Sequence, residues 1–204
     1  MILRVRALAK NMNIHLIYVI LISAALALGI YGVVVQRGAN LVRIDGRTAQ
    51  MALIWAAFQL LAALAGYGIG SWILHFELER DRSIFWIHIL AGVILAGIGV
   101  RMLLTAFKKK TFLEHRMENI DIRQDTLLSL RMCVHGCFAG IACGLLRLGL
   151  AQMLVCTFVL SALFAVAGYI SGRAWGAEPS DKAYAIGGGL LCVVSIVLQI
   201  LQFA

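Results

Sequence analysis

Long apolar segments, uncharged except for Arg101 in the third and Arg131 in the fourth, are the feature that most constrains this chain. Six of them can be counted, and each is close to the roughly 20 residues that a helix needs to cross about 30 Å of hydrocarbon. They cover residues 14–36, 50–74, 83–107, 126–146, 148–172 and 183–203. We therefore expect an all-α polytopic membrane protein, with six transmembrane helices embedded in the lipid bilayer.

The composition supports this expectation and excludes other classes of protein. Apolar residues make up 62% of the chain and charged residues 14%, whereas soluble domains carry about 25% charged residues. The formal net charge of +8 would suggest a nucleic-acid partner in a soluble protein, but in a membrane protein it indicates basic loops beside anionic lipid headgroups. We expect no nucleic-acid partner, and nothing in the sequence indicates the oligomeric state.

Motifs of enzyme chemistry are missing from the sequence. There is no phosphate-binding loop, nucleophile elbow or Cys-x-x-Cys pair, so we expect neither an enzyme nor a bound cofactor. The five cysteines all lie inside apolar segments, where they usually act as small buried hydrophobic residues. They are Cys133, Cys137, Cys143, Cys156 and Cys192.

A polar segment at residues 108–125 divides the chain nearly in half. This division predicts a first three-helix repeat at 1–107, a polar central loop at 108–125 and a second three-helix repeat at 126–204. Lys and Arg number ten on the side of the central loop and about six on the opposite side. By the positive-inside rule, the central loop then faces the cytoplasm and both termini lie outside.

One short motif occurs in both halves of the chain. Ala65-Gly-Tyr-Gly-Ile-Gly70 in the second segment is similar to Ala167-Gly-Tyr-Ile-Ser-Gly172 in the fifth, at an offset of 102 residues. With three spans per half, the second copy would be inverted relative to the first, as in many transporters. The fold expected is therefore an inverted 3+3 repeat. Chance recurrence in Gly- and Ala-rich helices is the alternative.

Polar residues within the spans are the candidates for a substrate pathway. None of the ten Asp and Glu residues lies in the middle of a span, although carboxylates are the usual ligands of hard cations and the usual proton carriers. The candidates are Gly29, Gln59, Arg101, His135, Cys137, Ser161 and Gln199. Arg101 could instead extend its side chain to the headgroups, and polar residues such as Gln59 and Ser161 could simply join neighbouring helices.

His135 and Cys137 offer the chemistry of a soft metal site. Residues two apart on a helix point about 200° from one another, so both could bind one ion only if the helix were unwound locally. A histidine whose hydrogen bonds are satisfied by a neighbouring helix is the other interpretation of His135.

The arrangement of spans and several motifs resemble the manganese efflux pump (MntP) family of bacterial membrane proteins. Ala52-Leu-Ile-Trp-Ala-Ala-Phe-Gln59, followed by Gly66-Tyr-Gly-Ile-Gly70, is similar to the family's G-L-I-F-G-x-x-E and G-x-G-x-G. Gly97-Ile-Gly-Val-Arg101-Met102 is similar to its G-G-R-M, and the last span to its G-G…V-Q-I-L ending. The resemblance implies a multi-pass transporter of the bacterial inner cell membrane that exports a metal cation.

The chain departs from this family at the carboxylates. Gly29 aligns with the aspartate of the family's S-M-D-A-F-A, Gln59 with its glutamate, and Cys137 with the aspartate of S-L-D-A-M-A-V-G. The resemblance therefore implies fold and topology more directly than manganese transport. We expect an exporter of a divalent or softer metal ion, or of a small solute; the alternative is a membrane interaction subunit that does not transport.

Overall fold

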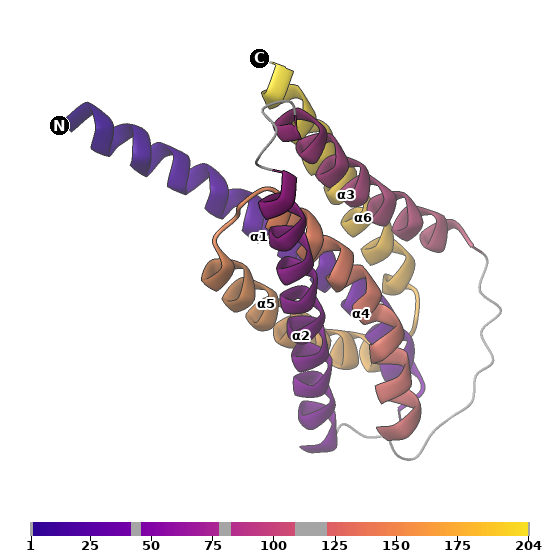
Figure 1. Cartoon of the computed structure of the whole chain (residues 1–204). Coiled ribbons are helices and arrows are strands. Elements are labelled where there is room, and N and C mark those ends of the chain that lie inside the picture. Colours follow the sequence, from indigo (N-terminus) through magenta and orange to yellow (C-terminus); the bar gives the residue numbers. More distant parts are fainter. Residues whose placement is uncertain (1, 42–45, 78–82, 109–121, 204) are drawn as a thin grey trace.

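The computed structural model describes residues 2–41, 46–77, 83–108 and 122–203 (Figure 1). Six helices follow one another: α1 (Ile2–Ala39), α2 (Gly46–Glu77), α3 (Ser83–Phe107), α4 (Ile122–Leu145), α5 (Leu150–Trp175) and α6 (Pro179–Phe203). Each of the six is long and apolar enough to cross a membrane. The predicted all-α fold with six transmembrane helices is therefore confirmed.

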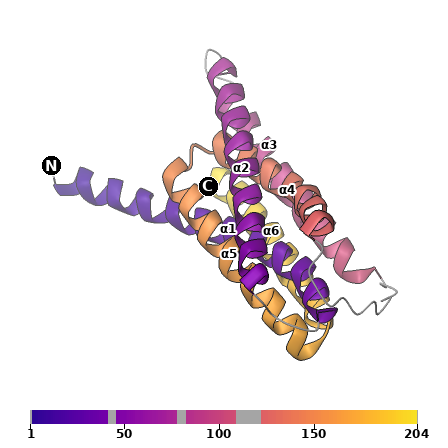
Figure 2. The same ribbon diagram turned by 90° about the horizontal axis from the view of Figure 1, so that it is seen from below.

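Most helices extend beyond the apolar segments that predicted them. Only α3 has the predicted bounds. Helix α1 begins at Ile2, and its N-terminal part projects from the bundle (Figures 1 and 2). Polar residues at the end of a span do not break a helix, because only proline and glycine strongly oppose it. The single proline, Pro179, is the first residue of α6, where its missing N–H has no helical partner to lose.

The helices of the first half (α1–α3) pack mainly on helices of the second half (α4–α6). The closest pairs are α2 with α4, α1 with α5 and α3 with α6, followed by α1 with α6, α2 with α5 and α3 with α4. Within the described residues, helices of the same half hardly touch. The helix most enclosed by the others is α1, whose spanning segment is 61% buried against 33–44% for the other five.

Glycines bring α2 and α4 into backbone contact. A Cβ atom added at Gly66 would overlap the carbonyl oxygen of Cys137, and one at Gly70 would overlap that of Ile141. From the opposite side, Gly140 lies against the backbone of Ala63. Small residues allow such close crossings, which increase van der Waals contact where lipid supplies no hydrophobic driving force.

The same kind of crossing joins α1 and α5. Gly172 of α5 lies against the carbonyl oxygen of Val35, and Gly168 lies close to the carbonyl oxygen of Tyr31. From α1, Gly38 lies against the carbonyl oxygen of Tyr169. Each half thus contributes one glycine pair, separated by one helical turn, to a crossing with the other half.

A very short turn connects α4 to α5, as the sequence predicts. Arg147 has a φ of 52°, and the amides of Arg147 and Leu148 donate to the carbonyls of Gly144 and Cys143 at 3.2 and 3.1 Å. This is the Schellman pattern of helix termination, with Arg147 at the position that usually carries glycine. The hydroxyl of Tyr67 donates to the Leu148 carbonyl at 2.8 Å and so attaches the turn to α2.

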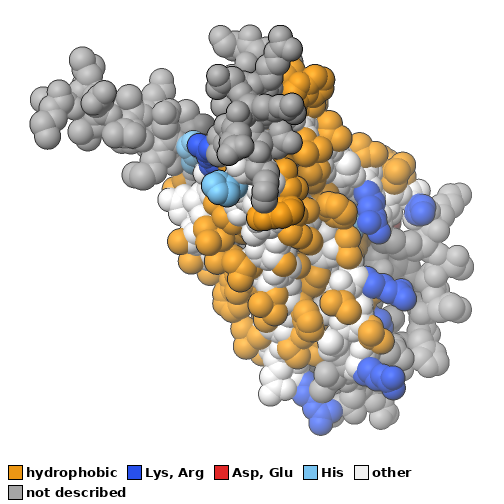
Figure 3. Space-filling model, in the orientation of Figure 1, with side chains coloured by type: hydrophobic (Ala, Val, Ile, Leu, Met, Phe, Trp, Pro, Cys, Tyr) orange, Lys and Arg blue, Asp and Glu red, His pale blue; other side chains and the backbone are white. Residues whose placement is uncertain are grey.

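The outer surface of the bundle is apolar. Large side chains such as Leu61, Trp72 and Val93 are 60–63% exposed, and apolar side chains cover the face seen in Figure 3. Lys and Arg side chains gather at one edge and at one end of that face. This distribution matches a bundle surrounded by acyl chains with one basic end.

Candidate functional site

Neutral hydroxyl groups lie buried between α1 and α5. The Oγ of Ser23 is 3.1 Å from the Oγ1 of Thr157, so one hydroxyl donates to the other. One turn further along α5, Ser161 is fully buried and its Oγ has no hydrogen-bond partner among the described residues. A buried hydroxyl without a partner loses its hydration and gains no hydrogen bond in return, so Ser161 Oγ is an unsatisfied polar group in this helix contact.

Gln59 of α2 lies directly on the backbone of α4. Its side chain is 2% exposed, and a Cβ added at Gly136 would lie 2.7 Å from Gln59 Nε2 and 3.1 Å from Oε1. The glycine therefore creates the room that the amide occupies. Since Gly136 directly follows His135, the amide lies beside the α4 turn that carries the histidine.

Gly29 of α1 faces the same part of α4 from another direction. A Cβ at this position would lie 3.3 Å from Met102 Cε and 4.0 Å from Met132 Cε. Met102 neighbours Arg101 on α3, and Met132 lies one turn before His135 on α4. Flexible methionine side chains thus occupy the space next to Gly29, where an acidic side chain would project if one were present.

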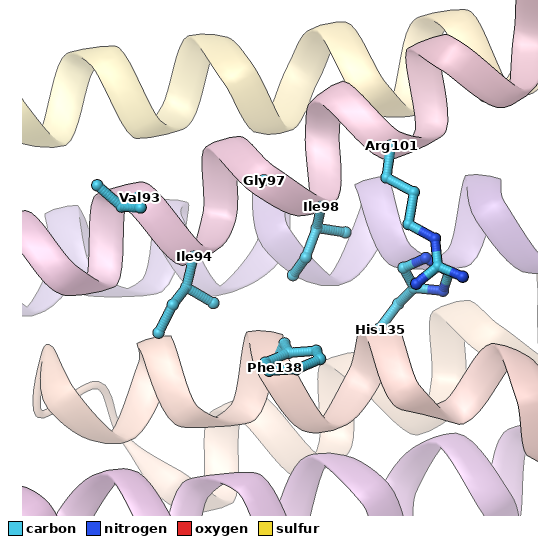
Figure 4. A pocket seen from close by; sticks show the side chains of 7 residues that line it. All are labelled: Val93, Ile94, Gly97, Ile98, Arg101, His135 and Phe138. Carbon is cyan, nitrogen blue, oxygen red and sulfur yellow. The ribbon is translucent and has the colours of Figure 1, made fainter.

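Arg101 and His135 line one pocket between α3 and α4 (Figure 4). Its volume is about 260 Å³, and the other lining residues are Val93, Ile94, Gly97, Ile98 and Phe138. Nδ1 of His135 is 3.3 Å from the carbonyl oxygen of Met132, so Nδ1 carries the proton in that contact. Nε2 is then a buried acceptor in the neutral ring, and it has no partner within the described residues.

Four of the seven candidate residues thus converge around the Met132–Gly136 turn of α4. They are Gly29, Gln59, Arg101 and His135. None of the seven residues that line the pocket, all in the described part of the chain, is acidic. The site combines neutral polar groups with one guanidinium.

Cys137 contacts α2 through its backbone carbonyl rather than through its thiol. Helix α4 continues without interruption through His135 and Cys137, so the two side chains leave the helix about 200° apart. The contact with Gly66 is made by the carbonyl of Cys137, not by its sulfur. Among the described residues no group of three or more His, Cys, Asp or Glu could hold a metal ion.

Gln199 joins α6 to α3, away from Arg101 and His135. Its Nε2 donates to the carbonyls of His88 and Ile89 at 3.3 and 3.4 Å, and Ser195 donates to the carbonyl of Gly92 at 2.7 Å. His88 precedes Arg101 by 13 residues on α3, or roughly 20 Å along the axis. In this structure Gln199 connects helices, the alternative noted for polar residues within the spans.

A buried ion pair escaped the sequence analysis. Asp125, assigned above to the central loop, lies in the first turn of α4 with 6% of its side chain exposed. Its Oδ1 is 3.1 Å from Arg37 Nε of α1, and its Oδ2 accepts a hydrogen bond of 3.3 Å from the Tyr169 hydroxyl of α5. No local sequence pattern indicates this contact, because the partners of Asp125 come from α1 and α5.

Beside this ion pair, a chain of hydrogen bonds attaches α1 to α6. Gln36 Nε2 donates to Ser180 Oγ at 2.7 Å, and Ser180 Oγ donates to the carbonyl of Gly32 at 2.7 Å. These contacts and the Arg37–Asp125 pair lie at the end of the bundle where α1 and α5 end and α4 and α6 begin. This end is therefore held by buried polar contacts among four helices.

Comparison with known proteins identifies the family. The profile described as "Putative manganese efflux pump" matches residues 44–201. Three relatives carry the name "Putative manganese efflux pump MntP". The protein from Clostridium perfringens strain 13 is 22% identical to this chain, and the match covers 87% of this chain and 91% of the relative. The protein from Methanobrevibacter smithii is 26% identical, covering 91% of this chain and 97% of the relative, and that from Corynebacterium efficiens is 30% identical, covering 79% of this chain and 86% of the relative. No solved structure matches the chain. The profile match and these relatives show that the chain belongs to the manganese efflux pump family.

Proposed function

We propose that this chain is an efflux transporter of the bacterial inner cell membrane that exports a small solute or a metal ion other than Mn²⁺. Membership in the efflux pump family and six membrane-spanning helices support export. The observation that carries the choice of substrate is the absence of acidic residues from the lining of the Arg101–His135 pocket, within the described chain.

We further propose that the two halves form an inverted repeat, with the substrate route where the halves meet. The helix pairing supports this, because exchanging α1 with α4, α2 with α5 and α3 with α6 leaves the set of paired helices unchanged. The glycine crossings support it too, since Gly66 and Gly70 of α2 have the same relation to α4 that Gly168 and Gly172 of α5 have to α1.

These crossings also support one particular register between α1 and α4 in the proposed repeat. Gly66 and Gly168 face the carbonyls of Cys137 and Tyr31, and Gly70 and Gly172 face those of Ile141 and Val35. Both comparisons give an offset of 106 residues.

Within the proposed repeat, this offset pairs Gly29 with His135. This register differs by two residues from the motif alignment, which pairs Gly29 with Cys137. The proposed register also places the closing glycine of the family's S-L-D-A-M-A-V-G at Gly140.

The charge of the site argues against a hard divalent cation. Mn²⁺ leaving water needs several oxygen ligands with compensating negative charge. In the proposed register Gly29, Gln59 and His135 stand where the family's motifs carry carboxylates, and the guanidinium of Arg101 adds positive charge beside His135. A neutral or anionic solute avoids this repulsion.

A soft metal ion is the remaining metal candidate. Neutral imidazole suits Zn²⁺ and copper ions, and thiolate suits Cu(I). His135 Nε2 is available for such an ion, whereas the Cys137 side chain would join it only if α4 unwound between the two residues. A soft metal site formed by both His135 and Cys137 therefore stays a prediction that requires local unwinding of α4.

Complementation of a manganese-sensitive strain that lacks its exporter tests the proposal. Three proteins are compared: the native chain, a triple variant Gly29→Asp, Gln59→Glu, His135→Asp, and a matched triple variant with Cys137→Asp in place of His135→Asp. The aspartate at Gly29 meets the flexible ends of Met102 and Met132. Intracellular contents of Mn, Zn, Cu, Co and Ni are measured, with protein amounts checked by immunoblot.

We expect the His135→Asp triple variant alone to restore manganese resistance. Rescue by the native chain as strong as that by an authentic exporter would refute the argument from missing carboxylates. Rescue by the Cys137→Asp triple variant alone would favour the register that pairs Gly29 with Cys137. A native chain that changes no metal content and no solute export, beside a triple variant that does export, would favour the non-transporting interaction subunit.

A further inference from the structure

The pocket between α3 and α4 opens to the outside of the bundle. Val93 on its α3 wall is 61% exposed and Phe138 on its α4 wall is 48% exposed. Gly97 between them has nothing within 4 Å of the position of a Cβ atom. Because the bundle spans a membrane, an outward opening at this height faces lipid acyl chains.

The lining of the pocket is amphipathic along the membrane normal. Val93 and Ile94 lie at one end, while Arg101 and His135 lie at the other, toward the end of α3 and the start of α4 (Figure 4). The volume of about 260 Å³ corresponds to roughly nine water-sized groups at about 30 Å³ each. This space is sufficient for a segment of acyl chain and too small for a drug-sized solute.

Basic residues surround the polar end. Arg131 lies one turn before His135 on α4, and Lys108 directly follows the end of α3; both side chains and that of Arg101 are exposed. Among the described residues, the ion pairs are those of Arg37 and Lys182 and involve none of these three. Lys and Arg gather along the corresponding edge in Figure 3.

The depth of these residues fits a lipid phosphate. Arg101 lies six residues before the end of α3, about 9 Å along the helix axis. A long Arg side chain at this depth reaches the headgroup region. Basic pockets between transmembrane helices on the cytoplasmic side are suited to anionic lipid headgroups.

We infer that the α3–α4 pocket binds an anionic phospholipid of the leaflet on the side of the central loop. Arg101 and Arg131 bind the phosphate through charge-assisted hydrogen bonds, and one acyl chain runs over Gly97 to Val93. A free inorganic anion would leave the apolar part of the pocket unfilled.

The test uses the full chain purified in a neutral detergent. Binding of phosphatidylglycerol, of phosphatidylcholine with the same acyl chains, and of inorganic phosphate is measured by native mass spectrometry and by the shift in thermal unfolding midpoint. The variants are Arg101→Gln with Arg131→Gln, and Gly97→Leu, which fills the pocket. Their matched controls are Arg173→Gln, an exposed arginine at the end of α5, and Gly68→Leu, an exposed helical glycine that also has open space around it.

We expect phosphatidylglycerol to bind and stabilise the native protein, and phosphatidylcholine and phosphate to do neither. The double arginine variant should weaken phosphatidylglycerol binding by at least about tenfold, because it removes charge-assisted contacts with the phosphate. Gly97→Leu should weaken binding because it occupies the space of the acyl chain, and both controls should leave binding unchanged. Equal binding of the two lipids, or an unaffected Gly97→Leu variant, would refute the inference. Competition by phosphate would assign the basic end to a soluble anion instead.

A photoreactive phosphatidylglycerol with a diazirine on one acyl chain tests the same inference on the unmodified protein. Adducts should form on the α3 segment 93–98 and on Phe138 and should decrease when unlabelled phosphatidylglycerol is added. Adducts spread evenly over the exposed residues of α5 and α6 would overturn the inference, whatever the variants show.

Discussion

Nε of Arg37 lies 3.1 Å from Oδ1 of Asp125, so an ion pair links the last turn of α1 to the first turn of α4. The exposed fractions of the two side chains, 24% for Arg37 and 6% for Asp125, place the acid deeper than the base. A buried charge is tolerated only with a partner. The two halves of the chain are therefore joined by an ion pair to which each half contributes one charge.

Replacing Asp125 by Asn should destabilise the protein. We expect the free energy of unfolding to fall by about 2–4 kcal/mol, because the Arg37 guanidinium loses its counter-charge in a buried setting. Unfolding in mixed micelles, followed by helical circular dichroism, measures the change. The double variant Arg37→Gln, Asp125→Asn should recover part of the loss; strictly additive effects of the two substitutions would show that the residues do not interact.

Gly66 and Gly68 should respond in opposite ways to the same substitution. Gly66→Ala should lower the free energy of unfolding by roughly 1–3 kcal/mol, since its Cβ overlaps the Cys137 carbonyl and forces α2 and α4 apart. Gly68→Ala meets open space and should be neutral or stabilising by up to about 1 kcal/mol. Thermal unfolding of both variants in one detergent makes the comparison, and an equal response would contradict the tight crossing.

Arg147→Gly should stabilise the α4–α5 turn. Arg147 has a φ of 52°, a left-handed conformation that a side chain disfavours by roughly 1–2 kcal/mol and that glycine adopts freely. Glycine raises the conformational entropy of the unfolded chain, which offsets part of this gain, so we expect a rise of about 1 kcal/mol at most. Arg147→Val, which is β-branched, should lower stability; a stabilised valine variant would show that the turn has another conformation.

Ser161→Ala should lower substrate export while leaving the stability of the protein nearly unchanged. The buried Oγ has no partner among the described residues, so its removal should change the free energy of unfolding by less than about 0.5 kcal/mol. Substrate export should decrease if this hydroxyl contacts the substrate. Thr157→Val is the structural comparison, because it breaks the hydrogen bond to Ser23 and should lower stability by about 1 kcal/mol. Unchanged export in Ser161→Ala would remove this residue from the pathway.

Both termini should lie outside the cell membrane and the 108–125 segment in the cytoplasm, as the ten-to-six distribution of Lys and Arg indicates. A C-terminal reporter that is active only in the periplasm should give a signal, while one that matures only in the cytoplasm should stay inactive. The reverse result would invert the orientation and place the basic end of the α3–α4 pocket in the outer leaflet.

The number of spans could be predicted from the sequence because apolar length alone decides whether a helix crosses a membrane. The helix ends could not, since the polar residues beyond each apolar segment neither require nor forbid another turn. Thus α1 starts at Ile2, well before the predicted segment. The burial of Asp125 depends on a contact with Arg37 from another helix, and no local pattern records which loop-edge residues will meet.

The candidate site was predicted in part. Gly29, Gln59, Arg101 and His135 are brought together by helix crossings whose glycines were recognised but whose partners were unknown. The motif alignment pairs Gly29 with Cys137, whereas the proposed repeat pairs it with His135. A short motif can be aligned in either register, and the backbone contacts of Gly66 and Gly70 favour the second.

The interleaving of the two halves has a consequence for biosynthesis. Helices α1–α3 leave the ribosome before α4–α6 exist, yet within the described residues they make few contacts with one another. Each must therefore wait in the bilayer as a separate, lipid-solvated helix, with its glycine faces covered only by acyl chains, until the second half is inserted. A chain that stops after α3 would be a set of loose helices exposed to quality-control proteases, and the two halves made as separate polypeptides would persist only when synthesised together.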